Sequence, residues 1–459
     1  MTWKLWHPRY GKYSIYDLRI ARLSTRYSHS DVRLNDSVRQ VKRLLMVAFQ
    51  FPPFAGSSGI QRTLRFAQQL PSVGWEPIVL TADPRAYPAQ STDLLSEIPE
   101  GIVVKQAFAV DTGRQFALFG RYPAFLARPD RWIGWRPGAV FSGLRLIRRY
   151  RPQVIWSTYP IATAHLVAQD LHRLSGLPWV ADFRDPMAQD GYPADSKTWR
   201  CFKSIEETAL HRANRSVFTT PGAAKLYRER YPNVPVDRVR VIENGYDEES
   251  FTRIHQPFRS VPLVPGKLTL LHSGVIYPSE RDPSHLFAAL GQLAAESRLD
   301  ADRFCLRLRA PGHEQLLYSL VRKHKADALV DIAPAISYDE ALVEMMRADG
   351  LVILQASNCN QQIPAKVYEY LRAGRPILGL TDPAGDTALL LRQAGINNIA
   401  RLDSIQEIVQ ALPVFLERIR SGRAELADPT FVANASRSKR TEELARLLDE
   451  VGGERPTMH

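Results

Sequence analysis

Short apolar runs alternate with helix-like segments along most of this chain, and this alternation constrains the fold more than any other feature. Arg43–Phe49 is an almost continuous apolar run, which is typical of a strand that is buried on both faces. A helix is predicted next, over residues 60–70. Strands that alternate with helices form parallel α/β sheets. The strands predicted in the first half of the chain are residues 43–49, 75–80, 102–106, 153–157, 178–182, 215–219 and 239–242.

The alternation starts again after residues 251–266, a proline-containing segment that is predicted to be a linker. Two successive doubly wound, Rossmann-like domains are therefore predicted, at residues 44–250 and residues 267–420. A terminal helix is expected over residues 438–450. The elements predicted in the second half are strands at residues 267–272, 304–309, 328–332, 350–354, 376–380 and 397–401, and helices at residues 283–297, 314–325, 338–347, 364–373, 385–394 and 404–419.

The 459 residues have an ordinary globular composition, 45% hydrophobic and 24% charged, which excludes a fibrous or wholly disordered chain. The formal net charge of +12 indicates an anionic partner, which could be nucleic acid, a phosphorylated ligand or an acidic membrane surface. Part of this excess lies in residues 1–43, a basic N-terminal extension without clear periodicity. A disordered tail and a start codon placed too early are both open explanations of this extension. Residues 251–459 carry equal numbers of acidic and basic side chains.

Cysteine usage and the N-terminus indicate the compartment. Cys201, Cys305 and Cys359 lie far apart, so the sequence contains no zinc-knuckle or thioredoxin-type motif, and the sparse, odd count fits a reducing compartment. No apolar run reaches the length of a transmembrane helix, and the N-terminus lacks the apolar core of a signal peptide. We therefore expect a cytoplasmic protein that can touch a membrane surface.

The loop after the first predicted strand is a candidate anion site. Gly56, Ser58 and Gly59 belong to this loop, which joins the strand to a helix. Free N–H groups at a helix start, and the close approach that glycine permits, favour a phosphate there. Arg62 in the first turn of the helix could add positive charge. The spacing differs from the dinucleotide fingerprint, and a plain tight turn is the alternative interpretation.

Charged side chains also gather where the strand predicted at residues 178–182 ends. Asp182, Arg184 and Asp185 follow one another there, and doubly wound sheets bind ligands at the carboxyl ends of their strands. An ion pair among these three residues within a loop is an equally open interpretation. Further along the chain, Asn244 is followed by glycine, which indicates a turn.

The second half carries a further set of candidate residues. Gly274 permits a tight turn after the first strand, and Arg281 precedes the next helix, where arginine suits bidentate phosphate recognition. Lys366 and Glu369 are three residues apart near the start of the helix predicted over residues 364–373, so they share a helix face. A lysine there can meet a phosphate, and a carboxylate can accept hydrogen bonds from sugar hydroxyls. A surface position for Arg281 and a salt bridge between Lys366 and Glu369 are the alternatives.

Taken together and in this order, these segments resemble the retaining family-4 glycosyltransferases of the GT-B fold, in particular the bacterial enzymes of polysaccharide and cell-envelope assembly. The resemblance covers about residues 43–450. It implies two Rossmann-like domains that face a cleft, the first binding the acceptor and the second a nucleotide-sugar, and a terminal helix that crosses back to the first domain. The segments that carry it are residues 51–59, 181–186, 244–247, 273–283 and 363–370.

The resemblance also assigns roles on the donor side. Arg281 and Lys366 would offset the charge of the donor diphosphate, and Glu369 would hold the nucleotide ribose. Neither a metal ion nor a cofactor is implied, since the nucleotide-sugar is itself a substrate and cations at the diphosphate act where negative charge develops. The remaining residues that the resemblance places at the donor are Gly56, Ser58, Gly59 and Gly274.

On the acceptor side the resemblance points to Asp182, Arg184 and Asp185, and it makes Asp185 a catalytic candidate beside the donor-side residues Arg281, Lys366 and Glu369. This chain departs from the family at two positions. The first of the family's two glutamates, eight positions before Glu369, is replaced by Gln361. Many members have a histidine near the end of the strand at residues 178–182, where this chain has Arg184 or Asp185.

Residues 112–151 combine many arginines with aromatic side chains, and Asp130 is the only acid among them. Arginines with interfacial aromatics suit an anionic membrane surface. The same mixture could bind single-stranded nucleic acid by stacking, and a solvated helix face whose aromatics lie in the core is the plain alternative. Because the resemblance implies a lipid-linked acceptor, we favour the membrane surface and expect no nucleic-acid partner.

The sequence therefore predicts a metal-independent glycosyltransferase of the hexosyltransferase type, and the resemblance implies that it retains the anomeric configuration. It would move a sugar from a nucleotide-sugar to a lipid-linked or saccharide acceptor in bacterial envelope or exopolysaccharide synthesis, on the inner face of the cytoplasmic membrane. Two alternatives stay open. One is a GT-B epimerase or hydrolase of nucleotide-sugars, which needs no acceptor. The other is a catalytically silent binding partner, to which Gln361 gives some weight, although Arg281, Lys366 and Glu369 argue against it.

Overall fold

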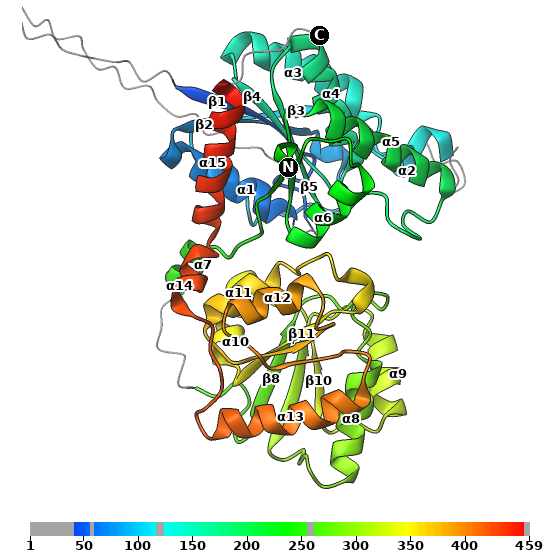
Figure 1. Cartoon of the computed structure of the whole chain (residues 1–459), viewed down its shortest axis with the longest axis vertical. Helices are drawn as coiled ribbons and strands as arrows, with labels where there is room; N and C mark the ends of the chain where they lie inside the picture. The colour runs from blue at the N-terminus through cyan, green and yellow to red at the C-terminus, as the bar shows by residue number, and fades with distance from the viewer. Residues whose placement is uncertain (1–40, 56–58, 116–123, 255–260, 454–459) are drawn as a thin grey trace, which may run out of the picture. The chain divides into compact units, whose positions relative to one another are not determined.

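The computed structural model describes residues 41–55, 59–115, 124–254 and 261–453. The first part of this chain forms a seven-stranded sheet in which every neighbouring pair of strands is parallel, in the order β3-β2-β1-β4-β5-β6-β7 (Figure 1). Its strands are β1 (Lys42–Val47), β2 (Trp75–Ala82), β3 (Val103–Ala107), β4 (Val154–Thr158), β5 (Trp179–Arg184), β6 (Arg215–Phe218) and β7 (Val239–Val241).

Helices connect these strands, as the parallel arrangement requires. Three of the helices of this half begin at side-chain caps, with Asp195 accepting from the amide of Thr198, Thr220 from that of Ala223 and Asp247 from that of Ser250. The helices of this half are α1 (Gly59–Gln69), α2 (Thr112–Gln115), α3 (Trp135–Tyr150), α4 (Ala162–Ser175), α5 (Ser196–Arg212), α6 (Pro221–Arg230) and α7 (Glu248–Arg253).

A second parallel sheet follows, in the order β10-β9-β8-β11-β12-β13. The predicted doubly wound pair of domains is thus confirmed. The strands are β8 (Leu268–Ser273), β9 (Phe304–Arg309), β10 (Val330–Ala333), β11 (Gly350–Leu354), β12 (Ile377–Leu380) and β13 (Ile399–Ala400). The helices are α8 (Ser284–Ala295), α9 (Glu314–Lys323), α10 (Tyr338–Arg347), α11 (Lys366–Ala373), α12 (Asp386–Gln393), α13 (Ile405–Arg420), α14 (Pro429–Asn434) and α15 (Arg437–Gly453).

Each sheet separates two cores, which explains the continuous apolar runs of the sequence. In β1, Leu45 and Val47 belong to one core cluster while Leu44 and Met46 belong to another, and all four side chains are fully buried. Successive side chains of a strand point to opposite faces, so a strand that is covered on both sides favours apolar residues at successive positions. Burial of each such side chain contributes about 1.5–3 kcal/mol to stability.

The terminal helix α15 packs against the first half of the chain, although it follows the second sheet in sequence (Figure 1). Leu444, Leu448 and Val451 join the same core cluster as Leu44 of β1. Ion pairs flank this contact, among them one of 3.1 Å between Arg240 and Glu450. The helix runs from Arg437 to Gly453, so it begins one residue before the predicted range of 438–450 and ends three residues after it.

Candidate functional site

A cavity of about 620 Å³ lies at the carboxyl ends of strands from both sheets. Tyr159 follows the end of β4 and Gln355 the end of β11, and both line the cavity. Doubly wound sheets place their ligands at this end of the strands. Of the residues predicted for the site, the cavity wall includes Arg184, Asp185 and Arg281.

Lys366 opens helix α11 beside this wall, directly after Ala365, which lines the cavity. Its Nζ lies 3.1 Å from Nε2 of His272. Nδ1 of His272 lies 2.9 Å from the carbonyl oxygen of Val352 and must donate to it, so Nε2 of the neutral ring accepts from the lysine ammonium. Burial, and after it the charges of Lys366 and Arg281, hold the pKa of His272 well below its usual range. The histidine therefore serves as a neutral acceptor that orients Lys366.

Lys366 and Arg281 form a pair of cations. Burial and then the charge of Arg281 hold the pKa of the Lys366 ammonium well below its usual range, and the Glu369 carboxylate opposes this shift. The Arg281 guanidinium donates to the carbonyl oxygen of Val275 at 2.6 Å and lies over the ring of Tyr277. A bound anion would relieve the repulsion between these two cations and restore the lysine pKa. The pair is therefore suited to hold phosphate oxygens.

Gly274 lets this pair form. It has a φ of +104°, which L side chains rarely adopt, and a Cβ at this position would lie 3.1 Å from Nζ of Lys366. Any larger residue would thus both strain the turn after β8 and crowd the ammonium group.

Glu369 lies one helical turn after Lys366 on α11 and is half-buried. Its Oε1 accepts a hydrogen bond of 2.8 Å from the hydroxyl of Tyr338, and burial raises the pKa of its carboxyl group. The salt bridge between Glu369 and Lys366, which the sequence left open, is not formed, because each side chain bonds another partner. Neither Lys366 nor Glu369 is part of the cavity wall itself.

Asp182 and Arg62 are bonded to each other. Asp182 is fully buried and lies behind the cavity wall, where it accepts two hydrogen bonds from Arg62, at 2.9 and 3.1 Å, and one from Thr158 at 2.9 Å. Arg62 also donates to the carbonyl oxygens of Ile242 and Glu243. The structure does not bring Asp182 to the cavity wall, whereas Arg62 lines it, and the acceptor role of Asp182 and the phosphate-binding role of Arg62 stay predictions. The two side chains form a buried pair that ties α1 to β5 and to the segment after β7.

Arg184 and Asp185 do reach the cavity. Arg184 has a φ of +58°, a strained value that turns the chain sharply at the end of β5. Burial lowers the pKa of its guanidinium and raises the pKa of the Asp185 carboxyl group, while their mutual attraction opposes both shifts. Gly59 leaves room for this arrangement, because a Cβ there would collide with Nη1 of Arg184 and with Oε1 of Gln50. Gly56 and Ser58, which the sequence also assigns to the donor, lie outside the described residues.

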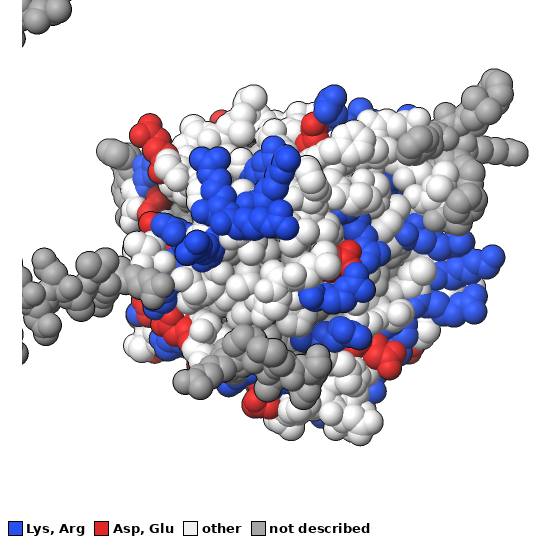
Figure 2. All heavy atoms as spheres, turned by 90° about the horizontal axis from the view of Figure 1, so that it is seen from above, with Lys and Arg blue, Asp and Glu red and all other residues white. Residues whose placement is uncertain are grey.

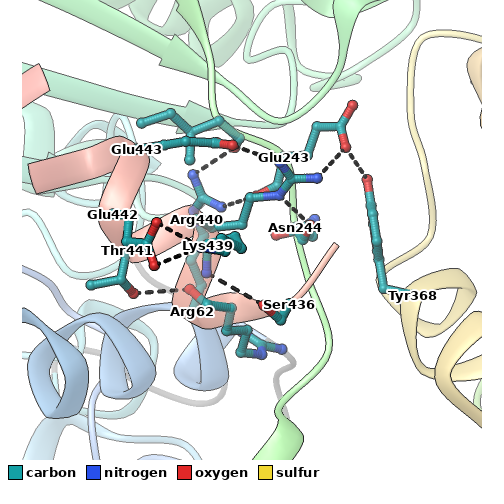
Figure 3. Close-up of polar contacts among 12 residues, drawn as sticks. Arg62, Glu243, Asn244, Tyr368, Ser436, Lys439, Arg440, Thr441, Glu442 and Glu443 are labelled. Atoms are coloured by element: carbon teal, nitrogen blue, oxygen red, sulfur yellow. Dashed lines mark hydrogen bonds and ion pairs between the residues drawn. The ribbon is translucent and has the colours of Figure 1, made fainter. Parts of the chain in front are cut away.

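Several residues of the site have no counterpart in the sequence motifs. Arg437, at the start of α15, lines the cavity. Figure 3 shows a second group close by, in which Glu243 accepts hydrogen bonds of 2.7 Å from Arg440 and 3.4 Å from the hydroxyl of Tyr368 on α11. Arg440 also pairs with Glu443 at 2.9 Å. The two contacts of Glu243 join positions more than a hundred residues apart, so no local pattern could reveal them.

Comparison with known proteins places this geometry in context. Residues 58–245 match the model of the family described as glycosyl transferase 4-like domain. No curated protein is similar enough in sequence to count as a relative. Within the described residues, no group of three or more histidine, cysteine or acidic side chains could hold a metal ion, and no helix is long and apolar enough to cross a membrane.

Solved structures resemble the whole chain at low sequence identity. Sucrose-phosphate synthase from Thermosynechococcus elongatus is 13% identical, with a TM-score of 0.58, over 90% of this chain and 96% of that one. HepE from Anabaena, solved with UDP-glucose, is 13% identical, with a TM-score of 0.61, over 89% and 99%. WaaG, a glycosyltransferase involved in lipopolysaccharide biosynthesis, is 12% identical, with a TM-score of 0.56, over 90% and 98%. This chain therefore has the GT-B fold, and its first half matches a glycosyl transferase 4-like domain.

Proposed function

We propose that this protein is a glycosyltransferase that moves a sugar from a nucleotide-sugar to an acceptor. The observation that carries the proposal is the pair of cations Lys366 and Arg281 beside a cavity at the strand ends. The match to a glycosyl transferase 4-like domain and the UDP-glucose complex of a protein with this fold support it. We also infer from the family resemblance that transfer retains the anomeric configuration.

The chemistry of such a transfer explains the cations. When the nucleoside diphosphate leaves, negative charge grows on the leaving oxygen and the sugar gains oxocarbenium character. Lys366 and Arg281 are fixed before the reaction at the position proposed for this charge, so they stabilise the transition state without reorganisation. They supply the positive charge that a divalent ion provides in other transferases, and we propose that no metal ion takes part.

On the opposite wall, we infer that Asp185 receives the proton of the acceptor hydroxyl. Its carboxyl group lines the cavity, and burial raises its pKa toward the range of a useful general base. Arg184 beside it limits this shift and keeps the carboxylate available as a proton acceptor.

We further propose that the acceptor is lipid-linked and that α3 faces an anionic membrane surface. Figure 2 shows Lys and Arg side chains gathered on the face seen from above, the side on which Figure 1 draws α3. The exposed side chains of Arg145, Arg148 and Arg149 form no ion pair with a described carboxylate. Next to them, Phe108 and Phe141 are 63% and 58% exposed. Two proteins of this fold are described as a lipopolysaccharide outer core galactosyltransferase and as a glycosyltransferase involved in lipopolysaccharide biosynthesis.

A nucleic-acid partner is less well supported by the same segment. Trp135 is fully buried, and Trp132 is half-buried with its indole N–H bonded to the carbonyl oxygen of Ala86 at 3.0 Å. These rings pack in the core and offer no platform for base stacking. Phe116, Phe119 and Tyr122, which the sequence also placed in this segment, lie outside the described residues.

Thermal stabilisation by nucleotide-sugars tests the proposal. A ligand present at a hundred times its Kd stabilises the folded protein by about 2.7 kcal/mol, which is an easily measured shift. We expect one family among UDP-, GDP-, ADP- and dTDP-sugars to raise the melting temperature. If none of them does, the protein is not a nucleotide-sugar enzyme and the silent binding partner is favoured.

A second candidate function is epimerisation, because UDP-N-acetylglucosamine 2-epimerase has the same fold, at 11% identity and a TM-score of 0.52. Product analysis separates the two activities. A transferase consumes the stabilising nucleotide-sugar only when an acceptor such as an isoprenoid-linked saccharide is present. An epimerase converts it to an isomeric nucleotide-sugar without acceptor, and a hydrolase releases the free sugar.

A further inference from the structure

Arg437 is the first residue of α15, and like Arg281 it lines the cavity beside the proposed donor site. Its side chain is 9% exposed. Its Nε is buried and has no hydrogen-bond partner. A guanidinium is a fork of five N–H donors, and leaving such donors unbonded in a buried position is costly. The residue therefore lacks the partner that a purely structural arginine would have.

Arg62 provides the contrast within the same cavity wall. It is 4% exposed, Asp182 accepts two hydrogen bonds from it, and two carbonyl oxygens accept two more, so four of its five donors are bonded. The carboxylates of Glu369 and Asp247 act on Arg437 only through space, and no ion pair joins either of them to it. Glu369 is bonded instead to the hydroxyl of Tyr338. Arg62 is thus satisfied by the protein, whereas Arg437 is free to bind a ligand.

The backbone holds Arg437 in this place through the turn at residues 244–247. The amide of Arg437 donates to the carbonyl oxygen of Tyr246 at 2.8 Å, and the amide of Tyr246 donates to Ala435 at 3.3 Å. A Cβ on Gly245 would lie 2.7 Å from the oxygen of Ala435 and 3.0 Å from the nitrogen of Arg437. Only glycine therefore lets the two segments approach each other. The Asn-Gly turn thus also holds the backbone at the start of α15.

We propose that Arg437 is a third cation of the donor site and that its guanidinium binds the diphosphate of the nucleotide-sugar. This inference rests on the proposed function. It places one donor-binding residue on α15, whose Leu444, Leu448 and Val451 are anchored in a core of the first half. Lys366 and Arg281 belong to the second half, so a bound diphosphate would be held by residues fixed to both halves of the chain.

Calorimetric titration tests this assignment. The probes are UDP, GDP, ADP and dTDP, and for the nucleotide that binds, the matching nucleoside, which lacks the diphosphate. Arg437→Gln should raise the Kd of the diphosphate by about 10- to 100-fold, the range expected for a hydrogen-bonded charge, and leave the Kd of the nucleoside unchanged. Arg446→Gln removes a charge from an exposed position of the same helix and should leave both values unchanged.

The outcomes are distinct. If the wild-type protein binds none of the four nucleotides, the proposed function itself fails. Two outcomes would refute the role of Arg437 alone. In the first, the wild type binds one nucleotide and Arg437→Gln binds it equally well. In the second, Arg437→Gln raises the Kd of the nucleoside and the Kd of the nucleoside diphosphate by the same factor. Should Arg437→Gln fail to fold, Arg437→Lys keeps the charge and loses the planar fork. Arg437→Lys should weaken binding of the nucleoside diphosphate by a smaller factor than Arg437→Gln does. Wild-type affinity in Arg437→Lys would overturn the assignment.

Discussion

At the scale of single residues, the proposed donor site depends on a lysine whose charged form is destabilised until an anion binds. Lys366 is half-buried and lies near the charge of Arg281, and among the described residues its ammonium group bonds the neutral ring of His272. The chain stabilises the charged lysine poorly, so the free energy of anion binding includes the recovery of that charge. The sequence could predict Lys366 and Arg281, because they lie in short motifs. It could not predict His272 as the acceptor, because that contact spans ninety-four positions.

Removing these side chains should impair turnover. Lys366→Ala and Glu369→Ala are each expected to reduce the rate of sugar transfer by about a hundredfold or more, the usual cost of losing a fixed group that stabilises developing charge or holds the donor. Lys323→Ala, which removes an exposed lysine from α9, should be without effect. Steady-state rates at saturating donor measure this, and full activity in both site variants would refute the assignments.

The lowered pKa of Lys366 predicts a pH dependence. A bound diphosphate raises that pKa, so binding is strongest where the free protein already carries the lysine proton and weakens as the pH rises through the lowered value. The nucleotide phosphates are fully ionised above about pH 7. The Kd of the bound nucleoside diphosphate should therefore rise between pH 7 and 10 in the wild type and stay flatter in Lys366→Ala. Identical profiles would contradict the role of this lysine.

His165 predicts a pH dependence of stability that is separate from the site. Burial lowers its pKa from 6.5 to about 4, so the unfolded chain binds the proton more readily than the folded one. Stability from this group is present above pH 6.5 and is lost as the pH falls toward 4, by about 3 kcal/mol. The free energy of unfolding, measured by denaturant titration at several pH values, should fall more steeply with decreasing pH in the wild type than in His165→Phe, which cannot titrate. Parallel curves would show that the histidine is not buried as described.

At the scale of elements, the bounds of the strands are easier to predict from the sequence than the tertiary contacts between elements. Both β9 and β11 begin and end where the sequence predicts, although β11 is a fully buried apolar run and β9 carries the half-buried Arg307 and Arg309. Helix α11 begins at Lys366, two residues later than predicted, because residues 363–365 line the cavity before the helix starts. The approach of α15 to the turn at residues 244–247 is a tertiary contact, which local periodicity does not encode.

The packing of α15 can be tested by one cavity-creating substitution. Leu448 is fully buried between this helix and the first half of the chain. Leu448→Ala should lower the free energy of unfolding by about 2–5 kcal/mol. Leu389→Ala on α12, where the side chain is 44% exposed, is the matched control and should cost far less. Equal losses in the two variants, measured by denaturant titration, would contradict the packing of α15.

At the scale of the whole molecule, charge is divided between the halves. The positive excess lies in the first part of the sequence, and the second part, which holds Lys366 and Arg281, is neutral overall. Composition could therefore predict an anionic partner without locating it. The structure adds that Arg145 lies 4.2 Å from the ring of the exposed Phe141, so that a charge and an apolar group share one surface. Such a surface suits the headgroup region of an anionic bilayer.

Reversal of these charges tests the membrane surface. The triple variant Arg145→Glu, Arg148→Glu and Arg149→Glu should weaken sedimentation with phosphatidylglycerol vesicles by well over tenfold, since each basic residue contributes about 1 kcal/mol. The matched control is Arg322→Glu, Lys323→Glu and Lys325→Glu, which changes three exposed cations of the second half. Equal loss in both triple variants would indicate a dependence on net charge alone, and no loss in either would exclude this face as the membrane contact.

The central claim is that a nucleotide-sugar binds with its diphosphate at Lys366 and Arg281. Calorimetric titration of the stabilising nucleotide-sugar into the wild type, Lys366→Ala, Arg281→Gln and the control Lys323→Ala tests it most directly. The account predicts one binding site in the wild type and the control, and affinity at least about tenfold weaker in each site variant. Undiminished binding in Lys366→Ala and Arg281→Gln would contradict it.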